Sequence, residues 1–213
     1  MIGNTCFKIC GLTRAADARL AAELGADYIG FILYAKSPRY LAVADYAALR
    51  ADLPAEPRRV AVMVEPAPDE LAAALGAGFD FIQIHARADI PFATVAAWSG
   101  VVSPARLWLA PKLPPGIPFP SLWLPLADTF LVDTFHAEGF GGSGKTGDWS
   151  GFARLAVSHP EKTWVLAGGL SPDNAASARG QSGARFLDVN SGVESAPGVK
   201  SPDKLRALVA ALS

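Results

Sequence analysis

The feature that most constrains this chain is an alternation of short apolar runs with alanine-rich helical stretches, repeated from one end to the other. The apolar runs predict strands at Phe7–Cys10, Tyr28–Leu33, Arg59–Val64, Phe79–His85, Arg106–Ala110, Phe130–Thr134, Trp164–Ala167 and Arg185–Val189. The periodicity between them predicts helices over Arg14–Leu24, Val43–Leu53, Asp69–Leu75, Pro91–Trp98, Gly151–Ser158, Pro172–Arg179 and Pro202–Leu212. This order predicts an α/β protein, a single (β/α)8 barrel domain over residues 1–213.

One unit in the middle of the chain departs from this pattern. The stretch from Pro111 to Pro125 contains six prolines, and proline removes a helical hydrogen bond and clashes with the preceding turn. We therefore expect the fifth helix to be short or missing. An open doubly wound sheet is the alternative fold, but it needs a glycine-rich turn after the first strand, which Gly11-Leu12-Thr13 does not provide.

The charge of the chain limits the partners we expect. Net charge is −1, with 18% charged residues and no Lys/Arg cluster, so the sequence predicts no nucleic acid and no membrane as partner. No window reaches about 18 uninterrupted apolar residues, and Met1–Cys6 lacks the basic and apolar segments of a leader. We expect a cytoplasmic protein that binds a small molecule.

Residues Gly139–Thr146 read G-F-G-G-S-G-K-T, which matches the pattern G-x-x-x-x-G-K-[ST] of nucleotide hydrolases. In those proteins a long helix begins at the lysine. Here Gly147 and Gly151 follow closely, and each glycine costs a helix about 1 kcal/mol relative to alanine. We interpret the segment as a glycine-rich loop over a ligand, followed by a helix with Asp148 or Ser150 as its N-cap.

Glycines at the ends of the last three strands predict an anion site. The loop after the sixth strand carries Gly144, the seventh strand ends in Gly168 and Gly169, and the eighth runs into Ser191 and Gly192. Barrels of this type commonly bind phosphate through backbone N–H groups of the loops after the last two strands. The alternative is that these glycines only permit tight turns.

Two candidate reactive groups, Cys10 and Asp133, close the first and sixth strands on opposite sides of the barrel mouth. That layout suits a base and an acid acting on two faces of one small substrate. The alternatives are a buried small hydrophobe for Cys10 and a helix cap or ion-pair partner for Asp133. Cys6 lies too far from Cys10 along a strand for a disulfide, so both thiols are expected to be free. Arg39, in the loop after the second strand, is a candidate bidentate clamp for a carboxylate, or else a surface arginine.

Lys8 is unusual because a period of two places it on the same face as Cys10, pointing into the barrel. A buried ammonium needs a partner, and Asp188 on the neighbouring eighth strand is the candidate. Gln83 is expected in the same polar layer. His85 could be a base, but a single histidine at a strand end is more often a hydrogen-bonding neighbour of the reactive groups.

Seven segments, in order from the first strand to the last helix, carry recognisable runs. They are Lys8–Thr13, Gly30-Phe31 with Ser37–Arg39, Gln83–His85, Leu131–Thr134, Gly141–Lys145 with Asp148-Trp149, Ala167–Leu170 with Asn174, and Asp188–Glu194 with Pro197–Lys200. Together they resemble phosphoribosylanthranilate isomerase of tryptophan biosynthesis. The runs K-I-C-G and D-V-N-S-G-V-E are the most specific of them.

The resemblance implies a (β/α)8 barrel, without metal or organic cofactor, that catalyses the Amadori rearrangement of N-(5-phosphoribosyl)anthranilate. By motif, Cys10 would be the general base, Asp133 the general acid and Arg39 the group that binds the anthranilate carboxylate. Opening the aminofuranose needs a proton on the ring oxygen, and forming the aminoketone needs loss of a proton from C2′, so one acid and one base suffice. Cys10 must then act as a thiolate, which nearby Lys8 would favour. The partner is expected to be a phosphosugar, and the chain a monomer or homodimer.

Three positions depart from the family pattern without touching an assigned catalytic residue. Ala86 and Gly147 stand where glycine and phenylalanine are usual, and Ser201-Pro202 replaces an aspartate. Among related enzymes, the aminoaldose isomerase of histidine biosynthesis would have an aspartate in place of Cys10, and a pentose-phosphate epimerase would have metal-binding His and Asp residues. A barrel that binds a phosphorylated ligand without turnover and a nucleotide hydrolase are the alternatives from other classes.

Overall fold

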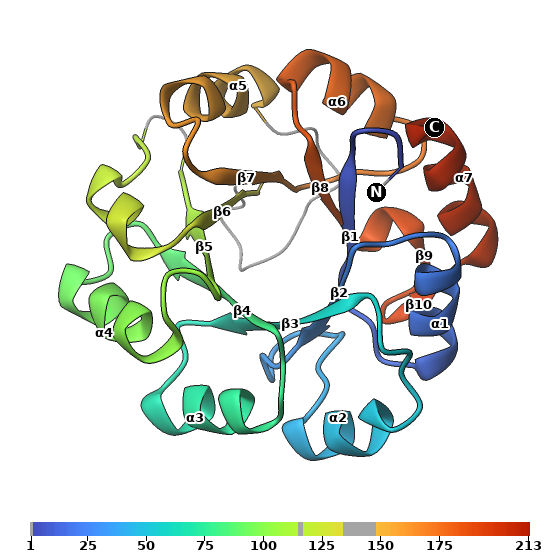
Figure 1. The fold of residues 1–213 in the computed structure, drawn as a ribbon, viewed down its shortest axis with the longest axis horizontal. Coiled ribbons are helices and arrows are strands. Elements are labelled where there is room, and N and C mark those ends of the chain that lie inside the picture. Colours follow the sequence, from blue (N-terminus) through green and yellow to red (C-terminus); the bar gives the residue numbers. More distant parts are fainter. Residues whose placement is uncertain (1, 115–116, 134–147) are drawn as a thin grey trace.

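Eight parallel strands pair in sequence order and close into a barrel, because β8 pairs with β1 (Figure 1). The computed structural model describes residues 2–114, 117–133 and 148–213. The strands are β1 (Cys6–Ile9), β2 (Tyr28–Ile32), β3 (Arg58–Val64), β4 (Phe81–Arg87), β5 (Leu107–Lys112), β6 (Thr129–Val132), β7 (Thr163–Leu166) and β8 (Phe186–Val189). The predicted (β/α)8 fold is confirmed.

Helices form a ring around the barrel (Figure 1). They are α1 (Ala15–Glu23), α2 (Val43–Arg50), α3 (Pro68–Gly76), α4 (Phe92–Val102), α5 (Trp149–Ser158), α6 (Ala175–Ser182) and α7 (Pro202–Leu212). Small residues let these helices approach the strands closely, as in α1, where Ala18 and Ala21 are fully buried. Across the described ranges, none of the helices has the length and apolar character needed to cross a membrane.

The proline-rich connection between β5 and β6 carries a 3-10 helix, η1 (Ser121–Leu126), in place of an α-helix. Pro125 lies inside it, and a 3-10 turn tolerates a missing N–H donor better than a long α-helix does. Trp123 anchors this segment in the core at 3% exposure. The expectation of a short fifth helix is confirmed.

Observed boundaries differ from the predicted ones by a few residues, and one hairpin was not predicted. Helix α7 begins at Pro202 as expected, because the Ser201 hydroxyl accepts a hydrogen bond from the Lys204 N–H at 3.4 Å. The Ser201-Pro202 departure thus starts a helix. Strands β9 (Glu194–Ala196) and β10 (Val199–Lys200) form the antiparallel hairpin that precedes it. Such short strands with charged residues carry no apolar alternation that a sequence reading could detect.

Aromatic rings fill the N-terminal end of the barrel interior. Tyr28 stacks on Phe186 with centroids 5.1 Å apart, and Trp108 meets both rings edge-on at 5.1 and 5.4 Å. Phe81 packs against Tyr28 and Trp108 at 5.6 and 5.5 Å. These four residues, which we name the aromatic plug, come from the first or second position of their strands. The polar side chains of the interior therefore lie toward the opposite, C-terminal end.

Candidate active site

A buried ion pair lies directly above the aromatic plug. Lys8 is fully buried, and its Nζ donates to Asp188 Oδ2 at 2.8 Å and to Gln83 Oε1 at 2.7 Å. The register of β1 against β8 places Lys8 opposite Asp188, so the predicted partner is confirmed and Gln83 joins the layer as expected. Nζ also lies 5.7 Å from the Trp108 ring centroid, within cation–π range.

The acceptors around Lys8 determine the state of His85. An ammonium group only donates, so the Gln83 carbonyl oxygen must face Lys8 and the Gln83 amide nitrogen must face His85, whose Nε2 lies 2.7 Å away. That nitrogen therefore accepts, and the proton of the neutral ring sits on Nδ1. Burial lowers the pKa of His85 to about 4, and the charge of Lys8 contributes. The imidazole is thus neutral at pH 7, as a hydrogen-bonding neighbour rather than a charged group.

Cys10 follows β1 directly, and its free thiol is almost fully buried. Cys6 is also a free thiol but is less buried. The backbone N–H of Cys10 donates to the Val189 carbonyl at 2.9 Å, which holds Cys10 at the end of β1 beside β8. Burial raises the pKa of the Cys10 thiol; Lys8 and Lys200 lower it, and Asp188 raises it. Lys8 thus favours the thiolate as expected, but burial outweighs it, and the thiol is the resting form.

Gly30 on β2 makes the space that Lys8 and Cys10 occupy. A Cβ at this position would lie 2.7 Å from Lys8 Cε and 3.0 Å from Cys10 Sγ. A glycine is therefore required where these two side chains meet. Lys8 and Cys10 can therefore lie side by side only because the residue on the neighbouring strand β2 has no side chain.

Asp133 follows β6 directly and is partly buried at the C-terminal end of the barrel. Strands β6 and β1 are separated by β7 and β8 in the closed barrel. Asp133 and Cys10 therefore come from strands that are not neighbours, at the same end of the barrel. This is the layout expected from the sequence.

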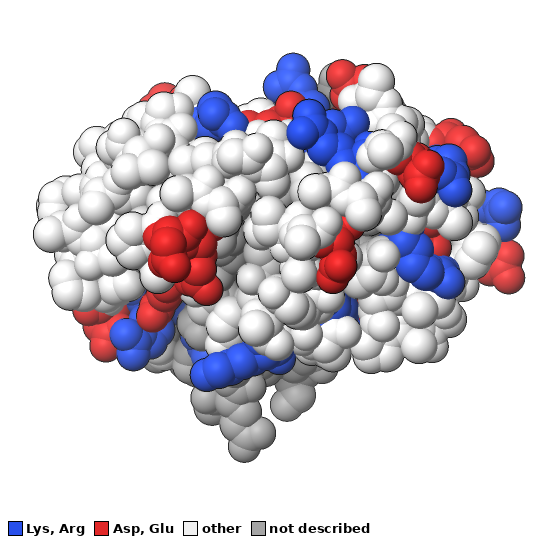
Figure 2. Space-filling model, turned by 90° about the horizontal axis from the view of Figure 1, so that it is seen from below, with Lys and Arg blue, Asp and Glu red and all other residues white. Residues whose placement is uncertain are grey.

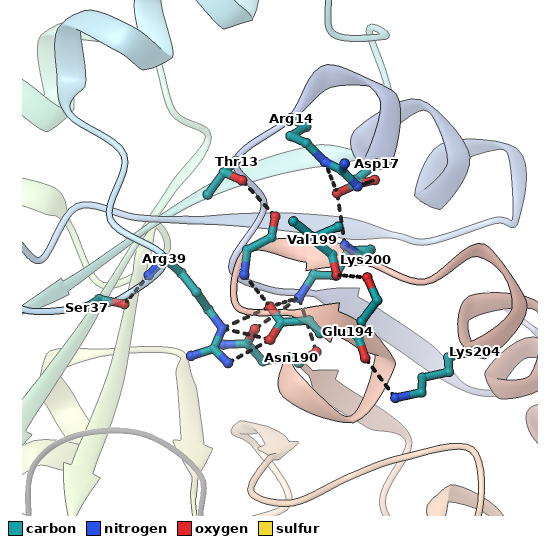
Figure 3. A network of polar contacts seen from close by, with 12 residues as sticks. Thr13, Arg14, Asp17, Ser37, Arg39, Asn190, Glu194, Val199, Lys200 and Lys204 are labelled. Atoms are coloured by element: carbon teal, nitrogen blue, oxygen red, sulfur yellow. Dashed lines mark hydrogen bonds and ion pairs between the residues drawn. The ribbon is translucent and has the colours of Figure 1, made fainter.

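Arg39 is held by a carboxylate that the sequence analysis did not assign. Its Nε and Nη2 donate to Glu194 at 2.9 and 2.7 Å (Figure 3). The loop that carries Arg39 returns to β2 through a β-bridge between Ile32 and Tyr40. This bridge fixes the backbone of the loop at the mouth of the barrel. Glu194 was visible only as the last letter of the D-V-N-S-G-V-E run, and no spacing rule connects it with Arg39.

Lys200 shares the same carboxylate. Its Nζ donates to Glu194 Oε1 at 2.9 Å, to the Asn190 carbonyl at 3.1 Å and to Asn190 Oδ1 at 3.0 Å. Gly11 has a φ of +71°, and a Cβ there would lie 2.5 Å from Asn190 Oδ1 and 2.7 Å from Arg39 Cδ. Gly11 follows Cys10 at the end of β1. Three segments therefore meet at Gly11: the end of β1, the Arg39 loop and the segment after β8.

Loops after β7 and β8 come together beside this cluster. Gly168 and Gly169 have φ values of +90° and +63°, which explains why glycine stands there. Asn174 fixes their loop, because its Nδ2 donates to the Gly169 carbonyl at 2.9 Å. A Cβ on Gly192 would run into the Leu170 carbonyl oxygen, so the two loops are in contact. Gly168, Gly169, Ser191 and Gly192 are thus brought together, whereas Gly144 lies outside the described residues.

The segment that resembles a nucleotide-binding loop, Gly139–Thr146, also lies outside the described residues, and the structure resumes at Asp148. Helix α5 begins at Trp149, with Asp148 as N-cap accepting from the Gly151 N–H at 2.8 Å. Of the two predicted N-caps, Asp148 and Ser150, the structure confirms Asp148. Among the residues that the structure describes, no group of three His, Cys, Asp or Glu side chains gathers as a metal-binding set.

Comparisons with known proteins agree on one family. A family model described as N-(5'-phosphoribosyl)anthranilate (PRA) isomerase matches residues 7–211. A protein from Ruegeria sp. named N-(5'-phosphoribosyl)anthranilate isomerase is 38% identical over 211 residues, which cover 96% of this chain and 95% of the relative. The crystal structure of phosphoribosyl anthranilate isomerase from Thermus thermophilus covers 98% of both chains with a TM-score of 0.82 and 32% identity. Another structure of this isomerase, in complex with reduced 1-(o-carboxyphenylamino)-1-deoxyribulose 5-phosphate, covers 98% of both chains with a TM-score of 0.73 and 28% identity.

Proposed function

The chain belongs to the N-(5'-phosphoribosyl)anthranilate isomerase family, and on that premise we propose that Cys10 and Asp133 carry out its acid–base chemistry. It is an isomerase of tryptophan biosynthesis, and its reaction is the Amadori rearrangement of N-(5-phosphoribosyl)anthranilate. The substrate is a small phosphorylated molecule that carries a carboxylate at the other end. The site must therefore hold two anionic ends and move protons between them.

Cys10 is the proposed general base. After the ring opens to an imine, the thiolate takes the proton from C2′, and the resulting enolamine tautomerises to the aminoketone. The observation that carries this assignment is the position of the thiol next to Lys8, whose ammonium is itself held by Asp188 and Gln83. A cation fixed in this way stabilises a thiolate without forming part of the substrate contact.

Asp133 is the proposed general acid. It gives a proton to the ring oxygen as the C1′–O bond breaks, which lets the ring open. Its place at the end of β6, across the barrel mouth from β1, supports this role because the two protons are moved at different atoms of the substrate. Each group should contribute about 10²- to 10⁴-fold in rate.

The two anionic ends are proposed to bind at separate places. The phosphate would be bound by backbone N–H groups of Gly169, Ser191 and Gly192, where the loops after β7 and β8 meet, with Gly144 completing the site. Arg39 would bind the anthranilate carboxylate through the edge formed by its two terminal amino groups, because Glu194 takes the Nε edge. One edge of the guanidinium then binds the carboxylate of Glu194, and the other edge binds the carboxylate of the substrate.

A coupled fluorescence assay tests the activity directly. Phosphoribosylanthranilate is generated in situ, and its fluorescence should fall when the purified chain is added. Asp128→Asn serves as a matched control for Asp133→Asn, because Asp128 precedes β6 at the opposite end of the same strand and is exposed. Failure of the folded chain to consume the substrate would contradict the proposal. Monomeric or dimeric state and a cytoplasmic location stay predictions.

A further inference from the structure

Three charged side chains form a buried cluster beside the proposed reactive groups. Arg39 is 18% exposed, Glu194 5% and Lys200 0% (Figure 3). Glu194 accepts from Arg39 on one side and from Lys200 on the other. One carboxylate therefore serves two cations, so the cluster has a net charge of +1.

Burial lowers the pKa of Lys200 and Glu194 raises it, while the hydrogen-bond partners of Nζ favour the charged form. Its Nζ faces three acceptors, Glu194 Oε1 and the two oxygens of Asn190. Three acceptors require three N–H donors, which only the ammonium form provides. The Lys200 backbone N–H donates in turn to Asp17 Oδ2 at 3.0 Å, which anchors the residue from the α1 side.

Without Lys200, Arg39 and Glu194 would be a neutral pair. A neutral pair attracts a second carboxylate weakly, because the attraction to the guanidinium and the repulsion from Glu194 largely cancel at short range. With Lys200 in place, its ammonium group balances the negative charge of Glu194 on the side away from Arg39. The free edge of Arg39, which points away from Glu194 in Figure 3, then faces a ligand with net positive charge.

We propose that Glu194 and Lys200 are positioning residues for Arg39, with Lys200 supplying the charge that keeps the arginine attractive to a carboxylate-bearing substrate. This inference rests on the proposed function. Glu194 orients the guanidinium by occupying its Nε edge, and Lys200 prevents that ion pair from neutralising the site. Asn190 links the cluster to Ser191 and Gly192, so the carboxylate end and the phosphate end are set from one segment.

Substitutions at the two positions should change KM in ways that charge alone predicts. Lys200→Met removes the offsetting cation and should raise KM severalfold, up to about tenfold, with kcat changed less. Glu194→Gln keeps an acceptor for Arg39 but leaves the cluster at +2, so KM should stay equal or fall. The double variant returns the cluster to +1 and should recover most of the KM lost in Lys200→Met.

Lys204→Met is the matched control. Lys204 donates at 2.7 Å to the backbone carbonyl of Glu194 rather than to its carboxylate, so the same change at that position should leave KM within about twofold. If Lys200→Met does not fold, Lys200→Gln keeps a donor for Asn190 without the charge and should show the same rise in KM. All variants are compared by circular dichroism and by thermal unfolding before kinetics.

The rescue distinguishes a charge effect from a structural one. If Lys200 only supported the fold, the double variant would lose more contacts and bind substrate no better than Lys200→Met; that result, or an unchanged KM in a folded Lys200→Met or Lys200→Gln protein, would overturn the inference. An unmodified chain without turnover would overturn the proposed function instead. Recovery of KM in the double variant supports the inference.

Discussion

The two ends of the barrel interior are built from opposite kinds of side chain. The N-terminal end contains the aromatic plug, whose four rings pack on one another at centroid distances of 5.1 to 5.6 Å. Above it lies the ion pair of Lys8 and Asp188, and beyond that Cys10 and the Arg39 cluster. Apolar burial stabilises the first end, whereas the second keeps charges buried at a cost that only paired partners reduce.

Charges on the outside of the molecule are arranged differently from those near the mouth. The face seen in Figure 2 carries acidic and basic residues dispersed among uncharged ones, in line with a net charge of −1. Two fully buried charges in the described part of the chain, those of Lys8 and Lys200, are instead held in ion pairs near the mouth. The difference between the two ends predicts that substitutions near the mouth reduce activity, whereas substitutions in the plug reduce stability.

The largest effect is expected at the phosphate loops. Gly169→Asp should lower substrate binding by more than about 10², because it places a carboxylate where the phosphate belongs. The φ of +63° at this position is one that Asp and Asn tolerate, so the barrel should stay folded. KM and circular dichroism are measured together. Gly169→Asn has the same shape without the charge, and equal losses in both variants would refute the electrostatic explanation.

Loss of either acid–base group should come next. Cys10→Ala and Asp133→Asn should each lower kcat by at least about 10², with the unfolding midpoint little changed. Since the base must be deprotonated and burial raises the pKa of Cys10, kcat/KM of the unmodified enzyme should rise as pH increases toward the alkaline range. Cys6→Ala, at the first position of β1, is the control for Cys10. Near-normal turnover in Cys10→Ala would end the assignment.

The plug should show the opposite behaviour. Phe186→Ala removes a ring that contacts Tyr28 and Trp108 and should lower the free energy of unfolding by about 3 to 5 kcal/mol. Turnover should stay within a few-fold at temperatures where the variant is folded. Urea denaturation and the coupled assay measure the two quantities. Val157→Ala, at an 80% exposed position, should leave both unchanged, and a hundredfold rate loss in folded Phe186→Ala would break the comparison.

A smaller effect is expected for Arg39. The substrate carboxylate is charged in both ground and transition states, so Arg39→Ala should raise KM, by roughly tenfold, more than it lowers kcat. Lysine should not rescue, because it cannot serve Glu194 and a second carboxylate through one planar group. The ratio of KM to kcat effects is the measurement. A fall in kcat at unchanged KM would point to a direct chemical role.

The last prediction concerns pH and stability. His85 has a pKa near 4 in the folded chain against 6.5 for the ordinary group, so between these values the unfolded chain binds a proton that the folded one excludes. The free energy of unfolding should therefore decrease as pH falls from about 6.5 to about 4. His85→Gln should flatten that decrease. Urea titrations across this range decide the matter, and an equal slope in the variant and in the unmodified chain would contradict the burial of a neutral imidazole.

Local chemistry predicted much of the site before the fold was known. Period two put Lys8 and Cys10 on one face, and closure of a parallel barrel made Asp188 the neighbour of Lys8, which the structure confirms. The Asp148 N-cap and the short fifth helix were also predictable, because caps and prolines act within a few residues. The acid, base and phosphate roles stay predictions carried by the family and by position.

What only the tertiary structure decided involves residues far apart in the chain. Glu194 holds Arg39 across 155 residues, and the missing side chain of Gly30 leaves space for Lys8 and Cys10. The sequence also suggested that Lys8 favours a thiolate at Cys10, whereas burial raises the pKa of that thiol overall. The strands and the faces of their side chains follow from periodicity, which is a local property. Desolvation and the sharing of one carboxylate by two cations depend on how completely the closed barrel excludes water, and no short segment of sequence contains that information.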